Sequence, residues 1–299
     1  MTERSLHHGP HVSPPEVAAS AASALFLGYS APMPGADSRY SDGAVAHETR
    51  LLGVPVLANV FSGATESPVG ETVLAAVLDS RSVAGYADLR AAGYLAPLAH
   101  AALLGEPLGK VLAGLSHGDA RLFARAVEIA GPGFGGGALA GALNVTLGAG
   151  RDATLRDAMR FVAGRDPLAR EYARNFEVVR ELARPALFNA LVRIEAARPA
   201  LVQAYLEVVA EVPDLDAMSR AGRKEAEEVS RMAHGALKAG GVYSRRGLQA
   251  IVNLDGLLRS DPRLKPSATE TPIVAAAFLL ALEQGPEFLN HRVRPAPQG

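Results

Sequence analysis

A run of charged residues near the middle of the chain has the spacing of one helix face. Asp166, Arg170 and Arg174 follow one another at intervals of four residues, and Glu177 comes three residues after Arg174. This series predicts exposed ion pairs, each worth a few tenths of a kcal/mol. Alternatively, Arg170 and the neighbouring Arg165 could face a polyphosphate, which a guanidinium fork binds well. Spacing alone favours the ion pairs and leaves phosphate binding open.

A glycine-rich stretch, GPGFGGG at 131–137, contains the G-x-G-x-x-G spacing of dinucleotide-binding loops. That loop needs a strand before it and a helix after it. A helical segment, Ala124 to Ala130, precedes it here, so we do not expect a Rossmann fold. The backbone amides of such a loop can still cradle a phosphate. A hinge that breaks the helix is an equally good interpretation.

Composition excludes several kinds of chemistry. The chain has 299 residues and no cysteine, which rules out disulfides, thiolate zinc sites, iron–sulfur clusters and cysteine nucleophiles. Its 30 basic and 31 acidic residues give a net charge of −1, so no global basic field would attract nucleic acid or an anionic membrane. Metalloprotease, esterase and EF-hand motifs do not occur. The scattered His47, His100, His117 and His234 are typical of surface or packed histidines.

Hydrophobic spacing predicts helices along almost the whole chain. Leu155, Met159, Val162 and later apolar residues up to Val179 recur at steps of three and four residues or their sum, and Thr154 is a plausible cap. No alternating run of β-branched residues predicts a strand. The fold class expected is therefore all-α, in a single large multi-helix domain. The other helices are expected at 15–27, 70–80, 89–104, 118–130, 185–195, 198–211, 226–237, 245–259 and 272–283.

The two ends of the chain are expected to differ from the domain. Residues 1–14 are polar and rich in His and Pro, which predicts a disordered tail. The helical domain should cover 15–285, and 286–299 should form a C-terminal tail. No signal-peptide core is present, and the longest apolar run, Ile273 to Leu282, is about half of what spans a bilayer. We therefore expect a cytoplasmic protein.

The order of segments resembles the triphosphoribosyl-dephospho-CoA synthase family. The similarity runs from about Val17 to Leu282, and RDPLAREYARNFEVV is its most specific part. The similar segments are SAPMPG (30–35), GETVLAAV (70–77), LAPLAHAA (95–102), AVEIAGPGFGG (126–136), RDPLAREYARNFEVV (165–179), EEVSRMA (227–233) and KPSATETPIVAAAFLLAL (265–282).

Several polar positions depart from the family pattern. Met33 stands where the family has a lysine, Tyr86-Ala87 where it has Asn-Thr, and Thr271 where it has an aspartate. These losses predict that the family's reaction is weak or absent, since general acid–base help alone is worth about 10²–10⁴ in rate. Asp88 and Glu270 place carboxylates next to the altered positions and could compensate.

The resemblance implies a reaction and a set of roles. The reaction joins the ribose C1 of ATP to a ribose 2′-hydroxyl and expels adenine, with Mg²⁺ accompanying ATP as the expected cofactor. A nucleotide or phosphorylated small molecule is the expected partner, without nucleic acid or membrane, and an oligomer is possible. The residues predicted for these roles are Asp166, Glu171 and Asp88 for catalysis, Arg39, Gly133, Gly135, Arg165 and Arg170 for binding phosphates, and Asp37 and Glu270 for the metal.

Three functions stay open at this point. The first is an ATP-using transferase like the family. The second is a member recruited to another coenzyme pathway, of which one-carbon carriers such as methylofuran and tetrahydromethanopterin are the natural suggestion. The third is a non-catalytic nucleotide-binding or assembly protein on the same helical scaffold.

Overall fold

The computed structural model describes residues 12–40, 45–131, 137–150 and 152–290. Within these ranges the chain is all-α, and no strand occurs. The α-helices are α1 (Pro14–Ser30), α2 (His47–Ser62), α3 (Val69–Ala84), α4 (Leu89–Leu104), α5 (Leu108–Ala113), α6 (His117–Ala130), α7 (Gly137–Gly148), α8 (Leu155–Val162), α9 (Pro167–Ala173), α10 (Arg184–Ile194), α11 (Ala197–Glu211), α12 (Leu215–Ala221), α13 (Arg223–Lys238), α14 (Arg245–Ser260) and α15 (Glu270–Gln284).

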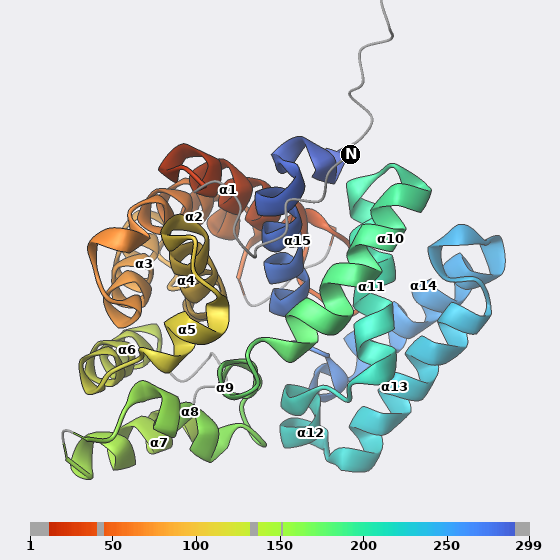
Figure 1. The fold of residues 1–299 in the computed structure, drawn as a ribbon. Coiled ribbons are helices and arrows are strands. Elements are labelled where there is room, and N and C mark those ends of the chain that lie inside the picture. Colours follow the sequence, from red (N-terminus) through yellow and green to blue (C-terminus); the bar gives the residue numbers. More distant parts are fainter. Residues whose placement is uncertain (1–11, 41–44, 132–136, 151, 291–299) are drawn as a thin grey trace, which may run out of the picture.

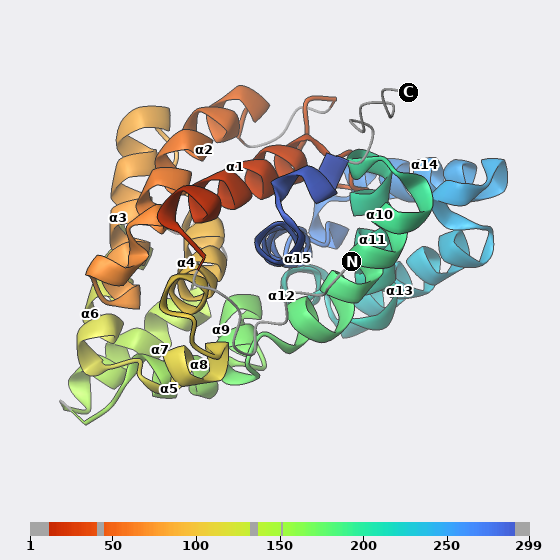
Figure 2. The same cartoon turned by 45° about the horizontal axis from the view of Figure 1, so that its top comes forward.

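The last long helix, α15, occupies the centre of the molecule. Figure 1 shows it between one group of helices formed by the N-terminal half and a second group formed by α10 to α14, and Figure 2 looks almost along its axis. It packs against α1, α4, α10 and α11. Every residue from Pro272 to Glu283 is buried. The sequence prediction of a single all-α domain with a buried helix at 272–283 is thus confirmed.

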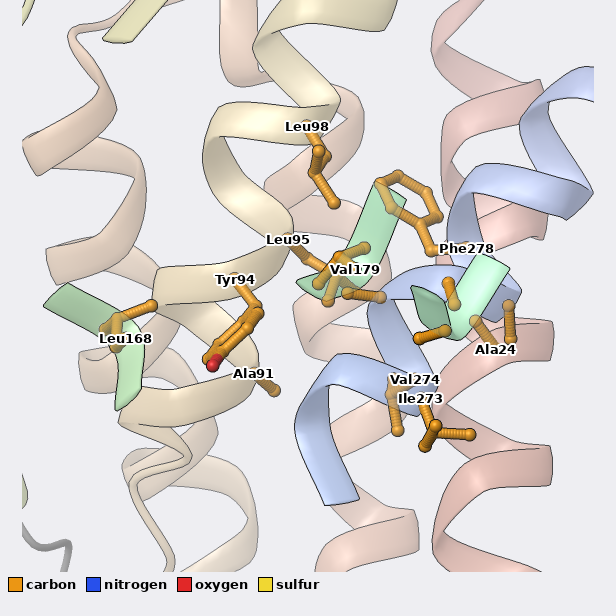
Figure 3. Close-up of a cluster of buried hydrophobic side chains, with 14 of the residues drawn as sticks. Ala24, Ala91, Tyr94, Leu95, Leu98, Leu168, Val179, Ile273, Val274 and Phe278 are labelled. Carbon is orange, nitrogen blue, oxygen red and sulfur yellow. The ribbon is translucent and has the colours of Figure 1, made fainter. Parts of the chain in front are cut away.

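Small and medium-sized side chains fill the core around α15. Ile273, Val274 and Phe278 of α15 lie near Ala24 of α1 and Leu95 of α4, as Figure 3 shows. Because many of the buried residues are alanine, helix axes can approach closely. At Gly28 of α1, an added Cβ would lie 2.4 Å from Val274 Cγ2, so only glycine allows this crossing.

The helix predicted after Thr154 is instead three segments. Thr154 and Asp157 form the capping box that starts α8, and α9 ends before Asn175 and Phe176, which adopt φ of 55° and 57°. A π-helix, Val178–Ala183, follows. The break has a physical cause: the buried Glu171 carboxylate accepts the Val178 and Val179 amides (3.3 and 3.2 Å), which a continuous helix would give to earlier carbonyls. The apolar stripe itself, from Leu155 to Val179, is buried as predicted.

The described helical structure continues past residue 285, where the sequence predicted the end of the domain. A short 3₁₀ segment, Pro286–Asn290, packs against α15 and α1. The ring of Phe288 stacks on that of Phe188 in α10, with centroids 5.5 Å apart. Of the predicted tails, 1–14 and 286–299, residues 1–11 and 291–299 lie outside the described residues. No described helix is long and apolar enough to cross a membrane.

Candidate functional site

A cavity of about 480 Å³ lies where distant parts of the chain meet. We call it the central cavity. The loop after α1, the first turns of α2 and α4, the helix α12, the loop before α15 and the start of α15 form its walls. The residues that line it are Gly28, Tyr29, Met33, Ala36, Asp37, Val45, Arg50, Tyr86, Asp88, Arg90, Ala91, Asp216, Arg220, Pro262, Lys265, Ser267, Glu270, Thr271 and Val274.

The loop after α1 is held in place by contacts with the C-terminal half of the chain. Tyr205 donates from its hydroxyl to the Pro34 carbonyl (3.0 Å), and the Gly35 amide donates to Asp255 (2.8 Å). Gly35 has φ of 75°, which disfavours a side chain, and an added Cβ would make a tight contact of 3.0 Å with Leu258 Cβ. These contacts fix the loop so that the next residues, including Asp37, form the cavity wall.

Two carboxylates and two cations alternate on one wall of the central cavity, and we call them the charged ring. Lys265 Nζ lies 2.8 Å from Asp37 Oδ1 and 3.6 Å from Glu270 Oε1. Arg50 lies 3.6 Å from both Asp37 Oδ2 and Glu270 Oε2. All four side chains are less than about one-fifth exposed, so water screens these charges only partly.

Arg50 of the charged ring also packs against the aromatic ring of Tyr29. Its guanidinium lies 5.6 Å from the centroid of the Tyr29 ring, a cation–π arrangement. Burial acts to lower the pKa of Arg50. The nearby carboxylate of Glu270, together with the Tyr86 hydroxyl and the Asp88 carboxylate, outweighs this effect and raises the pKa. Arg50 therefore stays cationic although it is mostly buried.

Asp88 links Tyr29 to the first turn of α4. Its Oδ1 accepts the Ala91 amide (2.9 Å) as the N-cap of the helix, and its Oδ2 accepts a short hydrogen bond from the Tyr29 hydroxyl. Burial raises the pKa of Tyr29, and the Asp88 carboxylate adds to the shift. Since both carboxylate oxygens are engaged, Asp88 holds Tyr29 and α4 in place.

A second charged cluster joins α4, α12 and the loop before α15. Arg90 forms a close ion pair with Asp216 and donates to the Ser267 carbonyl (2.6 Å). The Ser267 hydroxyl donates to Asp216 (2.8 Å) and accepts from Arg220 (3.1 Å). This network fixes the loop before α15 against two helices that are far away in the sequence.

The charged ring by itself does not fit a resident metal ion. Asp37 and Glu270 already lie next to two cations, with which a divalent ion would have to compete. No group of three or more metal-ligating side chains occurs in the part of the chain that the structure describes. The two predicted metal ligands are thus neighbours, but as a pair they are balanced by Lys265 and Arg50.

The structure brings three of the predicted site residues together. Asp88, Asp37 and Glu270 line the central cavity. Gly133 and Gly135 lie outside the described residues, and so does most of the loop at 131–137.

The other predicted site residues do not line this cavity. Arg39 is exposed beside Tyr40 (5.4 Å from its ring centroid), and Arg165 is exposed as well. Arg170 is partly buried, and its Nε has no hydrogen-bond partner. Asp166 caps α9 by accepting the Ala169 amide (2.8 Å). Glu171 is buried at the helix break described above. The exposed pair Arg174–Glu177 (3.4 Å) fits the ion-pair interpretation of this segment.

Glu171 should make stability depend on pH. Burial raises its pKa from 4.5 to about 7, against the opposing effect of the Val179 amide. An acid whose pKa is raised on folding stabilises the fold at low pH and loses this contribution as the pH rises through the folded pKa. The Glu171→Gln variant cannot ionise. Between pH 4.5 and 7 the wild type should lose on the order of 3 kcal/mol of unfolding free energy relative to this variant.

Urea unfolding of both proteins at pH 5 and pH 8 measures this difference. If the two proteins lose stability in parallel over this range, the Glu171 carboxyl does not titrate as argued.

The predicted site residues did not include seven charged or aromatic residues of the cavity wall, namely Tyr29, Arg50, Tyr86, Arg90, Asp216, Arg220 and Lys265. A usable signal was present. Met33, Tyr86 and Thr271, three positions that the resemblance predicts to depart from the family pattern, all line the central cavity. These three positions lie in separate segments of the sequence. The charged residues next to them were therefore candidates for a single shared site.

Comparisons with known proteins give a consistent result. The family model CitG, described as ATP:dephospho-CoA triphosphoribosyl transferase, matches residues 14–288. A crystal structure from Archaeoglobus fulgidus, of a protein provisionally named triphosphoribosyl-dephospho-CoA synthase, has the same fold, with a TM-score of 0.60 and 19% sequence identity. The alignment covers 80% of this chain and 98% of that one. A search of curated proteins returned no match.

Proposed function

Because the chain belongs to the CitG family of ATP:dephospho-CoA triphosphoribosyl transferases, we propose that it binds ATP in the central cavity and transfers the triphosphoribosyl group to an acceptor hydroxyl. The observation that carries this proposal is the joint presence of Arg50, Arg90, Arg220 and Lys265 with Asp37, Asp88, Asp216 and Glu270 in one cavity. Cations of this kind neutralise a triphosphate, and carboxylates stabilise positive charge that develops on a ribose ring.

The bonds that break and form in the proposed transfer define which chemical groups the cavity must supply. The bond between ribose C1 and the adenine nitrogen breaks, and a bond forms between the same carbon and the acceptor oxygen. The acceptor hydroxyl gives up its proton to a base, and adenine takes up a proton as it leaves. The ribose carries oxocarbenium-like positive charge between these events, so a nearby carboxylate lowers the barrier.

Glu270 is the carboxylate best placed to act as that base. It forms ion pairs with Arg50 and Lys265, both at 3.6 Å, and it accepts no hydrogen bond within the described residues. Asp37, by contrast, accepts a 2.8 Å hydrogen bond from Lys265, and Asp88 has both oxygens engaged. Glu270 therefore has the most accessible lone pairs for a proton.

Mg²⁺ enters this proposal as part of the substrate. Mg²⁺ is commonly held by one or two carboxylates together with substrate phosphates. Arg50 and Lys265 already balance the charges of Asp37 and Glu270. This supports an Mg²⁺ ion that binds together with ATP rather than one that is bound to the free protein.

A changed acceptor is the second candidate function. Met33, Tyr86 and Thr271 line the cavity at positions where the family pattern differs, and this clustering favours a member that transfers the same group to another coenzyme precursor. Glu270, which accepts no hydrogen bond from the described residues, lines the same cavity, and this supports retention of catalysis over a purely binding role.

A thermal-shift panel with ATP, ADP, dephospho-CoA and Mg²⁺ tests the proposed binding. A ligand at 100 times its Kd stabilises the fold by about 2.7 kcal/mol, which gives a clear shift in Tm. We expect the largest shift with ATP and Mg²⁺ together. The same Tm with and without every nucleotide would contradict the proposal.

A further inference from the structure

We infer that Arg220 anchors the anionic tail of the ligand and so sets the direction in which the ligand lies in the central cavity. The inference rests on the proposed function for the identity of that ligand, a nucleoside triphosphate. The anchoring itself concerns any polyphosphate that enters the cavity. Its basis is a comparison of the four cations in the wall.

Three of the four cations already have a carboxylate partner. Arg90 pairs with Asp216, Lys265 lies 2.8 Å from Asp37, and Arg50 lies 3.6 Å from Glu270. Arg220 differs from them, because all of its contacts are with uncharged oxygens: the Arg263 carbonyl (3.3 Å), the Lys265 carbonyl and the Ser267 hydroxyl (3.1 Å). Among the described cavity residues, it is the cation that forms no direct ion pair with a carboxylate, and its side chain is exposed to solvent.

These contacts also orient the guanidinium. They use one N–H each from Nε, Nη1 and Nη2. Because a guanidinium has five N–H donors, two remain, one on each terminal nitrogen. Since backbone carbonyls hold the plane in position, little side-chain entropy is lost when these donors bind an anion.

The position of Lys265 gives the ligand its direction. Its carbonyl accepts from Arg220, whereas its ammonium faces Asp37 and Glu270. A ligand whose terminal phosphate binds at Arg220 therefore extends past Lys265 toward Glu270. The opposite orientation would place phosphates beside the two carboxylates, which repel any phosphate that no Mg²⁺ bridges to them.

Isothermal titration with inorganic tripolyphosphate, adenosine, AMP, ADP and ATP tests the inference. The variants are Arg220→Ala, Arg220→Lys and a control, Arg223→Ala, which removes an exposed arginine at the start of the adjoining helix α13. Two charge-assisted contacts are lost in Arg220→Ala, so its affinity for tripolyphosphate and ATP should fall about tenfold to a hundredfold. Its affinity for adenosine should not change. Arg220→Lys should be intermediate, and Arg223→Ala should match the wild type.

A further variant separates anchoring from a structural role. Ser267→Ala removes one contact that orients Arg220 but keeps its charge, and we expect less than about a tenfold loss of tripolyphosphate affinity. The inference is overturned if tripolyphosphate does not bind the wild type, if it binds Arg220→Ala equally well, or if adenosine and ATP lose affinity in parallel. Tripolyphosphate binding that depends on Arg220, without adenine release from ATP, would support the anchor and contradict the proposed function.

Discussion

Replacement of Glu270 by glutamine is expected to lower the rate of adenine release from ATP by about 10²–10⁴-fold, the usual contribution of a general base. Glutamine keeps the size of the side chain but cannot accept the proton of the acceptor hydroxyl. Affinity for ATP should be unchanged or higher, because the substitution removes a negative charge that lies 3.6 Å from both Arg50 and Lys265. Chromatography of adenine gives the rate, and thermal shift gives the binding.

Glu48→Gln is the matched control. Glu48 is an exposed residue in the first turn of α2, two residues before Arg50, so its loss should change neither quantity. Adenine release at the wild-type rate in Glu270→Gln would contradict the assignment of the base. Loss of ATP binding in that variant would point to a role in binding instead.

Substitution of Gly70 by alanine should destabilise the fold by about 1–3 kcal/mol, the usual cost of overpacking. Gly70 lies in the first turn of α3, and its amide donates to Asp119 of α6 (2.8 Å). An added Cβ would lie 2.6 Å from the Asp119 carbonyl oxygen and 2.7 Å from its Cα. Since these are backbone atoms, the two helices would have to move apart. Urea unfolding measures the change.

Gly256→Ala provides the comparison for that experiment. Gly256 lies within α14, and nothing is within 4 Å of the position of its Cβ. Alanine there should stabilise the fold by roughly 0.5–1 kcal/mol. If both variants have the same unfolding free energy, the close approach of α3 and α6 does not limit stability.

Hydrophobic spacing was enough to predict the helical fold. The buried stripe from Leu155 to Val179 and the apolar run of α15 follow directly from it, because the periodicity of a helix is local. The break at Asn175 and Phe176 could not be predicted in this way. It depends on a buried carboxylate, Glu171, that accepts two amides, and the residues on either side of the break keep an apolar spacing that also suits a continuous helix.

The central cavity was less accessible to sequence reasoning. Lys265 and Asp37 form an ion pair although 228 positions separate them, and Arg90 reaches Asp216 across 126 positions. Pairings at such distances depend on how helices pack rather than on local spacing. The best sequence match, at 165–179, directed attention to Arg165 and Arg170, which do not line the cavity. The positions 33, 86 and 271, at which the sequence was predicted to depart from the family pattern, indicated the site better.

Adenine release from ATP and Mg²⁺, measured with and without dephospho-CoA, tests the proposed transfer most directly. If dephospho-CoA is the acceptor, the proposed transfer predicts that adenine appears in proportion to the dephospho-CoA consumed, that its release stops when dephospho-CoA is omitted, and that Glu270→Gln abolishes most of it. ATP binding without adenine release, with dephospho-CoA present, would contradict transfer to this acceptor. Release that requires a different coenzyme precursor would establish the changed acceptor in its place.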